Sequence, residues 1–383
     1  MKKFILILVA LLIIISPSTF SYAEGEIGTT EQVQSELVKA KILNVEQLEN
    51  DPDNPIFTKL MMVKVEILNG EYKGEQFEIP HNLTGSYGYD IDVEPGDKVL
   101  VTVEKIEDGS VEVYISEHLR DTYVYIVAAI FVALILIIGR VKGLKTIITL
   151  ILTILLVLKG LLPGLLAGYN PILLTIGIAL IITVVTILTV SGMNRKSYAA
   201  IIGVLGGVFV AGLIAYVIGS KVKLTGLSSE EAVMLMYIPQ GIKFDFKGLL
   251  FAGIIMGALG AVMDVGMSIS SSMEEIRNAD PTMSTKTLIM SGMNVGKDIM
   301  GTMANTLILA YTGSSIPLLL LFTAYEEDFT KIINLDIIAT EIIRAFAGSI
   351  GLILCIPVTA LVAGVLMGKH ETAEENITDM DKI

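Results

Sequence analysis

The sequence predicts a polytopic α-helical membrane bundle with a small exported all-β domain at its N-terminus. Hydrophobic residues make up 53% of the 383 residues and charged residues only 17%, whereas soluble proteins carry about 25% charged residues. From residue 123 onward, apolar runs close to or longer than about 18 residues recur, which is the length that spans a bilayer. Before them, apolar and polar residues alternate in short runs, a pattern typical of β-strands.

The composition divides the chain into four parts. A short apolar segment comes first, an acidic segment with strand-like alternation follows, and a long apolar region and an acidic tail complete the chain. We expect residues 1–23 to be a signal peptide or an uncleaved anchor, residues 24–121 an exported β-domain, residues 122–368 a seven-span membrane domain, and residues 369–383 a cytoplasmic tail.

The first segment has the layout of a secretory signal. Lys2 and Lys3 precede the apolar run Phe4–Ile15, and Ser21 and Ala23 place small residues at the two cleavage-site positions. If the signal is not cleaved, the same run anchors the chain in the membrane. In both cases the segment that follows is exported.

The net charge of −13 is concentrated in the exported segment. Residues 24–121 hold 22 acidic and 8 basic residues, which gives −14, whereas residues 122–368 hold 13 acidic and 15 basic residues, which gives +2. A nucleic-acid partner requires a basic surface that attracts phosphate. The charge pattern therefore excludes nucleic acid as a partner.

The exported segment predicts five or six short strands within about 85 residues. Asn69-Gly70 is a favoured hairpin dipeptide between two of these strands. The strand count favours an OB-like barrel or a sandwich, and this fold alone implies no function. The clearest alternating runs are Leu37–Ile42, Val63–Ile67, Phe77–Ile79, Val99–Val103 and Val111–Ile115.

Seven hydrophobic segments follow, and their flanking charges predict an orientation. The connections expected in the cytoplasm carry Arg140, Lys142, Arg195 and Lys196, among others, which fits the excess of Lys and Arg on that side of membranes. The lysines of the exterior loop 220–247 weaken this bias. We expect a multi-pass protein of the bacterial cell membrane, with its N-terminal domain outside and its C-terminus inside. The expected spans are 123–139, 144–158, 171–191, 198–219, 248–270, 298–323 and 345–367.

The fifth span combines small residues with an ionisable one. Gly253 and Gly257 begin a stripe at four-residue spacing that lets another helix approach closely. Asp264 and Ser268 continue near this face, and Asp264 lies about 24 Å along the helix from Gly248, in the cytoplasmic half of the bilayer. A carboxylate at this depth indicates a functional site. The alternative is a helix-packing Asp that bonds to neighbouring hydroxyls.

The sixth span carries a matching polar face. Asp298, Thr302 and Asn305 recur at helical spacing, Asn294 precedes them, and Gly313–Ser315 interrupts the span near its exterior end. Polar groups on a buried face beside a helix break fit the lining of a route for an ion or a polar solute. For Asp298 the alternative is a favourable interaction with the positive end of the helix dipole.

In the last span, Arg344, Gly348, Gly351 and Cys355 share one face. The two glycines are predicted to mediate helix packing. We interpret Arg344 as an anchor at the outer interface, or alternatively as the counter-charge of a permeant anion or of Glu341. The single cysteine is expected to be a small buried apolar residue.

The sequence does not favour an enzyme. It contains no nucleotide-binding loop and no serine–base–acid set. Three His and one Cys leave too few ligands for a clustered metal site, and His81 and His118 are predicted to lie on the surface. We therefore expect no catalytic residues, no metal and no cofactor.

Three long segments resemble the YibE/F-like family of bacterial multispan membrane proteins. They are GALGAVMDVGMSISSS (257–272), SGMNVGKDIMGTMANTLILAYTGSSIPLLLLF (291–322) and EIIRAFAGSIGLILCIPVTA (341–360). The resemblance covers about residues 120–368 and implies a transporter-like membrane protein, without an assignment of site residues. A weaker similarity is to the membrane half of SecD/SecF and other RND-type permeases, and it implies a proton-relay role for Asp264.

The function that these observations favour is transport. A small ion or solute would pass a polar route between spans five to seven, where the candidate transport or relay residues lie. The alternative is a non-transporting envelope scaffold or a secretion accessory whose exported β-domain binds a partner. The expected partners are the lipid bilayer, the unknown ion or solute, and an envelope protein or a second copy of the chain. The candidate residues are Asp264, Ser268, Asn294, Asp298, Thr302, Asn305 and Arg344.

Overall fold

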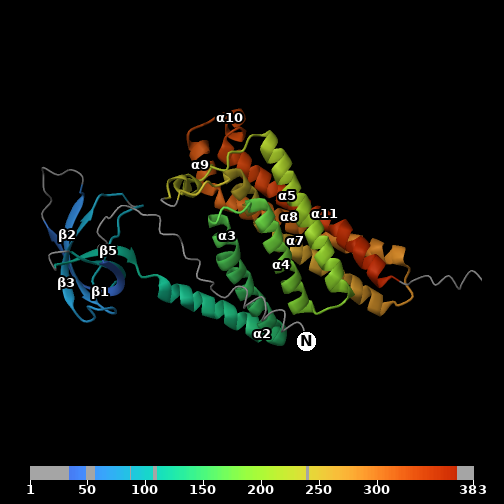
Figure 1. Ribbon diagram of the computed structural model, residues 1–383, viewed down its shortest axis with the longest axis horizontal. Coiled ribbons are helices and arrows are strands. Elements are labelled where there is room, and N and C mark those ends of the chain that lie inside the picture. Colours follow the sequence, from blue (N-terminus) through green and yellow to red (C-terminus); the bar gives the residue numbers. More distant parts are fainter. Residues whose placement is uncertain (1–33, 49–56, 87, 107–109, 239–240, 369–383) are drawn as a thin grey trace, which may run out of the picture. The chain divides into compact units, whose positions relative to one another are not determined.

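The computed structural model describes residues 34–48, 57–86, 88–106, 110–238 and 241–368 (Figure 1). These residues form two compact units, which divide between Leu134 and Ile135. The predicted signal segment and the predicted acidic tail lie outside the described residues.

The first unit is a five-stranded antiparallel half-barrel. Its strand order is β3-β2-β1-β4-β5, so the long β1 pairs with both β2 and β4. The partly open five-stranded barrel is the geometry of OB-like domains, and the predicted all-β fold is confirmed. The strands are β1 Gln34–Leu48, β2 Lys59–Ile67, β3 Gln76–Leu83, β4 Lys98–Lys105 and β5 Val111–His118.

Alternation along the strands builds the core of this unit. On β2, Val63 and Val65 are buried while the residues between them are partly exposed, because successive side chains of a strand point to opposite faces. The predicted hairpin dipeptide lies in the β2–β3 turn. Gly70 has φ +87°, and Asn69 Oδ1 accepts a hydrogen bond of 2.6 Å from the Lys39 amide.

The second unit begins within a helix that changes direction. Helix α2 (Asp121–Leu156) has a non-helical residue at Arg140, with φ 47° and ψ −123°. Helix η1 (Val157–Leu161) and α3 (Leu162–Leu166) continue the apolar stretch to a total of 46 residues. A straight helix of that length would be about 70 Å long, more than twice the thickness of the hydrocarbon core. The change of direction at Arg140 falls between the first two predicted spans.

The remaining long helices form a packed bundle, with α3 beside α4 (Figure 1). Polar caps begin several of them: the side chains of Asn170, Asn194, Asp245 and Ser284 accept hydrogen bonds from the first turns. The bundle comprises α4 Pro171–Ser191, α5 Arg195–Lys221, α7 Phe246–Ala279, α8 Thr285–Ser314, α9 Ile316–Ala324 and α11 Asp336–Met367, with the short α6 Glu230–Met234, η2 Leu235–Tyr237 and α10 Phe329–Ile333.

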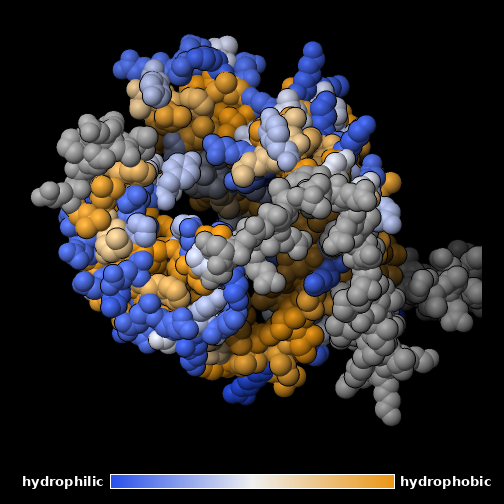
Figure 2. Space-filling model, turned by 60° about the vertical axis from the view of Figure 1, so that its left-hand side comes forward, coloured by the Kyte–Doolittle hydropathy of each residue, from blue (hydrophilic) through white to orange (hydrophobic). Residues whose placement is uncertain are grey.

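Five helices of the described residues are long and apolar enough to cross a membrane, or up to six if the bent pair α8 and α9 forms one span. The first of the five is the 46-residue stretch that changes direction at Arg140. Hydrophobic areas remain on the surface (Figure 2), and Ile138 is 81% exposed. Such surface belongs in lipid, because soluble proteins seldom expose large apolar patches. The count of seven spans stays a prediction.

Helices α5, α7 and α11 meet at the centre of this unit, where small residues allow their backbones to approach. A Cβ added at Gly351 would lie 2.6 Å from the Gly207 carbonyl oxygen and 2.7 Å from the Ala211 side chain. Cys355 is fully buried, and its Sγ lies 3.7 Å from the Val262 carbonyl oxygen. The backbone of α11 therefore lies directly against α5.

Candidate functional site

Asp264 lies on an exposed face of α7, together with Gly253, Gly257 and Gly260. Among the described residues it has no hydrogen-bond or ion-pair partner. Asp264 is about 27 Å from the first residue of α7 and about 22 Å from the last, which places it near the middle of the helix. Within the described residues Asp264 therefore makes no hydrogen bond to a neighbouring hydroxyl, which is the contact that the alternative of a packing Asp requires.

The small residues predicted to mediate packing differ in their surroundings. A Cβ added at Gly253 would meet open space, whereas one added at Gly257 would lie 2.8 Å from Tyr311 Oη. Gly348 is buried, and a Cβ added there would lie at ordinary contact distances, 3.6 Å from the Ala258 side chain and 3.9 Å from the Leu307 side chain. Gly351 is in tight contact with α5. Gly253 thus packs against no helix of the described chain, because its face of α7 points away from the bundle.

Helix α8 carries its polar side chains on a face that also points away from the bundle. Asn294, Asp298, Thr302 and Asn305 are all exposed. Thr302 donates a hydrogen bond of 2.9 Å to the Ile299 carbonyl oxygen, so its hydroxyl is satisfied within the helix. The two Asn side chains and Asp298 have no hydrogen-bond partner among the described residues. Ser268, which completes the predicted set on α7, is half-buried.

Asp264 of α7 lies at nearly the same depth as Asp298 and Asn305 of α8. The two helices are antiparallel neighbours, joined by a short turn at 280–284. Met273 lies against Gly292, and Ile269 lies 3.2 Å from a Cβ added at Gly296. Continued along both helices, this register places Asp264 level with residue 301, between Asp298 and Asn305 and within about 6 Å of each along the helix axis. We call the exposed surface of Asp264, Asn294, Asp298, Thr302 and Asn305 the polar face.

The interruption predicted at the exterior end of the sixth span is present. Helices α8 and α9 meet at an angle of 61°. Ser314 and Ser315 both donate their hydroxyls to the Tyr311 carbonyl oxygen, over 2.7 and 3.1 Å. Pro317 lies in the first turn of α9, where its missing N–H costs no helical hydrogen bond. Helix α8 therefore ends at Ser314, and the chain restarts after Ser315 as α9 in a new direction.

A cavity of about 170 Å³ lies beside this bend, between α8, α9 and α11. Its polar lining comes from Tyr311, Thr312, Ser315 and Glu341. Glu341 Oε1 accepts a hydrogen bond of 2.7 Å from Arg344 Nη1, whereas Glu341 Oε2 is buried and has no partner among the described residues. Because a buried carboxylate oxygen costs free energy when it is unpaired, this cavity is suited to water or to a ligand that donates hydrogen bonds.

Arg344 does not belong to the polar face. Of the roles predicted for it, the structure shows pairing with Glu341. Helices α7 and α11 run in the same direction, with Ala258 beside Gly348, so Arg344 lies about 15 Å from the level of Asp264 along the axis. The candidate residues therefore form two groups, one at mid-helix on α7 and α8 and one at the α8–α9 bend.

The opposite end of α7 is held by charged contacts that the sequence analysis missed. Lys196 Nζ lies 2.5 Å from Glu274 Oε2, which ties α5 to α7. Arg277 Nη1 donates to the carbonyl oxygens of Pro281 and Met283, over 3.2 and 2.7 Å. Residues 271–297, expected as the longest cytoplasmic connection, are in the structure the end of α7, a short turn and the start of α8. The sequence signal for these contacts was Arg277, a positively charged residue near the C-terminal end of a helix, where such side chains bond to free carbonyl oxygens.

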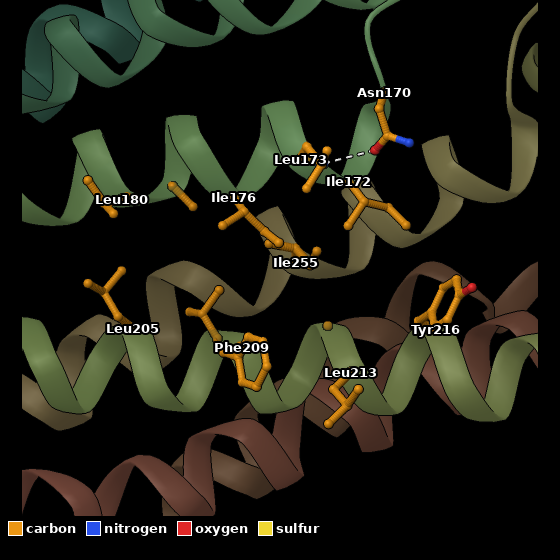
Figure 3. A pocket seen from close by; sticks show the side chains of 13 residues that line it. Asn170, Ile172, Leu173, Ile176, Leu180, Leu205, Phe209, Leu213, Tyr216 and Ile255 are labelled. Atoms are coloured by element: carbon orange, nitrogen blue, oxygen red, sulfur yellow. Dashed lines mark hydrogen bonds between the residues drawn. The ribbon is translucent and has the colours of Figure 1, made fainter.

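A larger cavity of about 560 Å³ lies between α4, α5 and α7, and its lining is almost wholly apolar (Figure 3). Ile176 of α4, Phe209 of α5 and Ile255 of α7 line it. Asn170 and Tyr216 supply polar atoms, and Asn170 Oδ1 already accepts a hydrogen bond of 3.0 Å from the Leu173 amide. This cavity suits an apolar chain such as that of a lipid, and it lacks the polar lining that an ion requires.

The apolar helices define a multi-pass α-helical membrane protein with an N-terminal β half-barrel. Residues 127–369 match the family described as YibE/F-like protein, and residues 31–118 match the YibE/F family N-terminal domain. The chain therefore belongs to the YibE/F-like family, as the three sequence segments predicted. No curated protein and no solved structure matches the chain.

Proposed function

We propose that this protein moves a small ion or polar solute across the bacterial cell membrane, along the polar face of α7 and α8. The observation that carries the proposal is the shared depth of Asp264, Asp298 and Asn305 on two neighbouring helices. Ionisable and amide groups inside a membrane are costly, and they mark the routes of ions and protons in membrane proteins. Asp264 would carry the charge or the proton, and Asp298 and Asn305 would coordinate or relay it.

The bend between α8 and α9 supports the same function. Broken helices in membrane proteins place irregular backbone where it lines a cavity, and here the bend adjoins the cavity that Glu341 lines. In the predicted orientation this end of α8 faces the exterior. The cavity at the bend would be the outer entrance, and the polar face would continue the route about 10 to 15 Å deeper.

Flux into reconstituted vesicles tests the proposal. The purified protein would be screened for uptake of protons, Na⁺, K⁺ and small polar solutes. Asp264→Asn keeps the side-chain volume and removes the charge, so it is expected to abolish any flux that the wild-type protein supports. The matched control is Asp92→Asn, because Asp92 is an exposed residue of the β half-barrel. Flux that is unchanged in Asp264→Asn would remove this residue from the mechanism.

A second function, that of an envelope scaffold, is favoured by one observation. The β half-barrel is a compact unit of its own, as expected for a partner-binding module. Deletion of residues 24–118 separates the two functions. A scaffold would lose its cellular phenotype, whereas the membrane domain of a transporter would keep its flux. A secretion accessory would instead make protein export depend on the proton gradient.

A further inference from the structure

The polar face has an unmet physical requirement. It exposes Asp264 on α7, a helix long and apolar enough to cross a membrane, and it exposes Asp298 and two Asn side chains on α8, which is a candidate span only together with α9. Lipid tails offer these groups no hydrogen bonds, and polar residues within spans face protein or water. The polar face therefore cannot lie against acyl chains.

We propose that a second copy of this chain packs against the polar face, related to the first by a two-fold axis along the membrane normal. Two-fold dimers are the commonest oligomers, and their interfaces use the same surface of both copies. A rotation about the membrane normal leaves depth unchanged. Each polar group of one copy therefore lies at the same depth as the polar groups of the other copy. The two copies can then supply each other with the hydrogen-bond and ion-pair partners that lipid tails lack.

Charge complementarity argues for this occupant. Lys297 of α8 is exposed and has no ion-pair partner among the described residues, as is true of Asp264. In the α7–α8 register, Lys297 lies about 6 Å from the level of Asp264 along the axis, a separation that a lysine side chain bridges. Two symmetric pairs between Lys297 and Asp264 would neutralise two charges on each copy. A partner that lacked a basic residue at this depth would leave Asp264 unpaired.

The backbone shape of the face suits close helix contact. Gly253 and Gly260 of α7 and Gly301 of α8 are exposed, and a Cβ added at any of them would meet open space. Such residues allow the backbones of two membrane helices to approach. The surface of α5 is different, since Phe209 is 61% and Leu213 48% exposed, and such large apolar side chains are suited to lipid.

The dimer completes the proposed transport route, because the polar face would be enclosed between the two copies. The inference itself does not depend on transport, since it follows from the depth and exposure of the polar face. Flux and association can therefore fail separately. Flux without a dimer would place the route within one copy, whereas a dimer without flux would leave a polar interface and remove the transport function.

Disulfide cross-linking in native membranes tests the dimer. Gly260→Cys and Gly301→Cys place a thiol on the polar face where the added side chain has room, and Phe209→Cys and Leu213→Cys are the matched lipid-facing controls. The native Cys355 is buried, so the wild-type chain serves as the blank. Oxidation is expected to give a reducible band of twice the chain mass for the two face variants only. Equal cross-linking of the controls, or no cross-linking at the face, would overturn the proposal.

Charge exchange tests the identity of the partner. Two differently tagged copies would be co-expressed and the co-purified fraction measured. Lys297→Asp places like charges together, so co-purification is expected to fall about tenfold, and the double variant Asp264→Lys with Lys297→Asp is expected to restore it. No fall in the single variant, or a fall that the double variant does not reverse, would contradict the pairing. In the cross-linking experiment, a band of any mass other than twice the chain mass would assign the polar face to a different protein.

Discussion

Glu341 and Arg344 lie one helical turn apart on α11 and form an ion pair of 2.7 Å, which satisfies only one of the two carboxylate oxygens. The other oxygen, Glu341 Oε2, is buried without a partner among the described residues. Glu341 also lines the cavity at the α8–α9 bend. The side chains of Glu341 and Arg344 are 23% and 31% exposed. The pair is thus buried enough to matter for stability and open enough to meet a ligand.

Glu341→Gln is expected to lower the free energy of unfolding by about 1 to 3 kcal/mol, because Arg344 loses a charged acceptor in a partly desolvated site. Thermal unfolding in detergent measures the change. The double variant Glu341→Gln with Arg344→Gln removes both charges and should recover part of the loss. If the losses of the single variants Glu341→Gln and Arg344→Gln simply add in the double variant, the ion pair contributes no coupling energy.

Gly351→Ala is expected to destabilise the bundle by about 1 to 3 kcal/mol, the range of overpacked cores. The added Cβ would lie 2.6 Å from the Gly207 carbonyl oxygen, and a Cβ at Gly207 would meet the Gly351 carbonyl oxygen at the same distance. Neither backbone can yield without separating α5 from α11. Unfolding in a denaturing detergent measures the loss.

The matched control for this substitution is Gly177→Ala on α4. A Cβ added at Gly177 meets open space, so alanine should be neutral or slightly stabilising through its higher helix propensity. Equal losses at positions 351 and 177 would show that the close contact between α5 and α11 is not the cause.

The local patterns of the sequence were enough to predict the β half-barrel and the apolar helices. Alternation places Val63 and Val65 in the core, and the Gly313–Ser315 interruption before Pro317 predicts the bend. These features depend on neighbours along the chain, so periodicity and turn chemistry reveal them.

The candidate site was less predictable, because it depends on which side of a helix faces its neighbours. The spacing on α7 places Asp264 and Gly253 on one face, as observed. It does not reveal that this face is exposed, since the packing of α5 and α11 decides which side is buried. The position of Asp264 along its own helix could be worked out from the sequence. Its distance from Arg344 along the helix axis could not, because that distance depends on how α11 is aligned with α7.

The turn at Asp90 is expected to lose order in acid. Asp90 Oδ1 accepts from the Thr84 amide at 2.8 Å and Oδ2 from the Gly85 amide at 2.6 Å. The hydrogen bonds from Thr84 hold the pKa of Asp90 below its ordinary value of 3.8. A depressed folded pKa stabilises the turn above pH 3.8, and this contribution disappears as the pH falls through the folded pKa.

Hydrogen exchange of the Thr84 and Gly85 amides measures this effect. Their protection should be constant from neutral pH down to about pH 4 and fall below it. Asp90→Asn should give lower protection that does not change over the same range. Protection that persists in the wild-type protein well below the pKa would contradict the role of the ionised carboxylate.

Arg140→Gly is expected to stabilise the chain by about 1 kcal/mol. Arg140 has φ 47° and ψ −123°, close to the first central position of a type II′ turn, where glycine is favoured because a Cβ is strained. Arg140→Ala removes the same charge but keeps the Cβ, so it separates the backbone effect from the loss of the guanidinium. If alanine and glycine change the unfolding temperature equally, the backbone at Arg140 is not strained. A tight reversal between two predicted spans requires that the Arg140→Gly variant unfold at a higher temperature than the wild type. It also requires that the Arg140→Ala variant unfold at the wild-type temperature or below it.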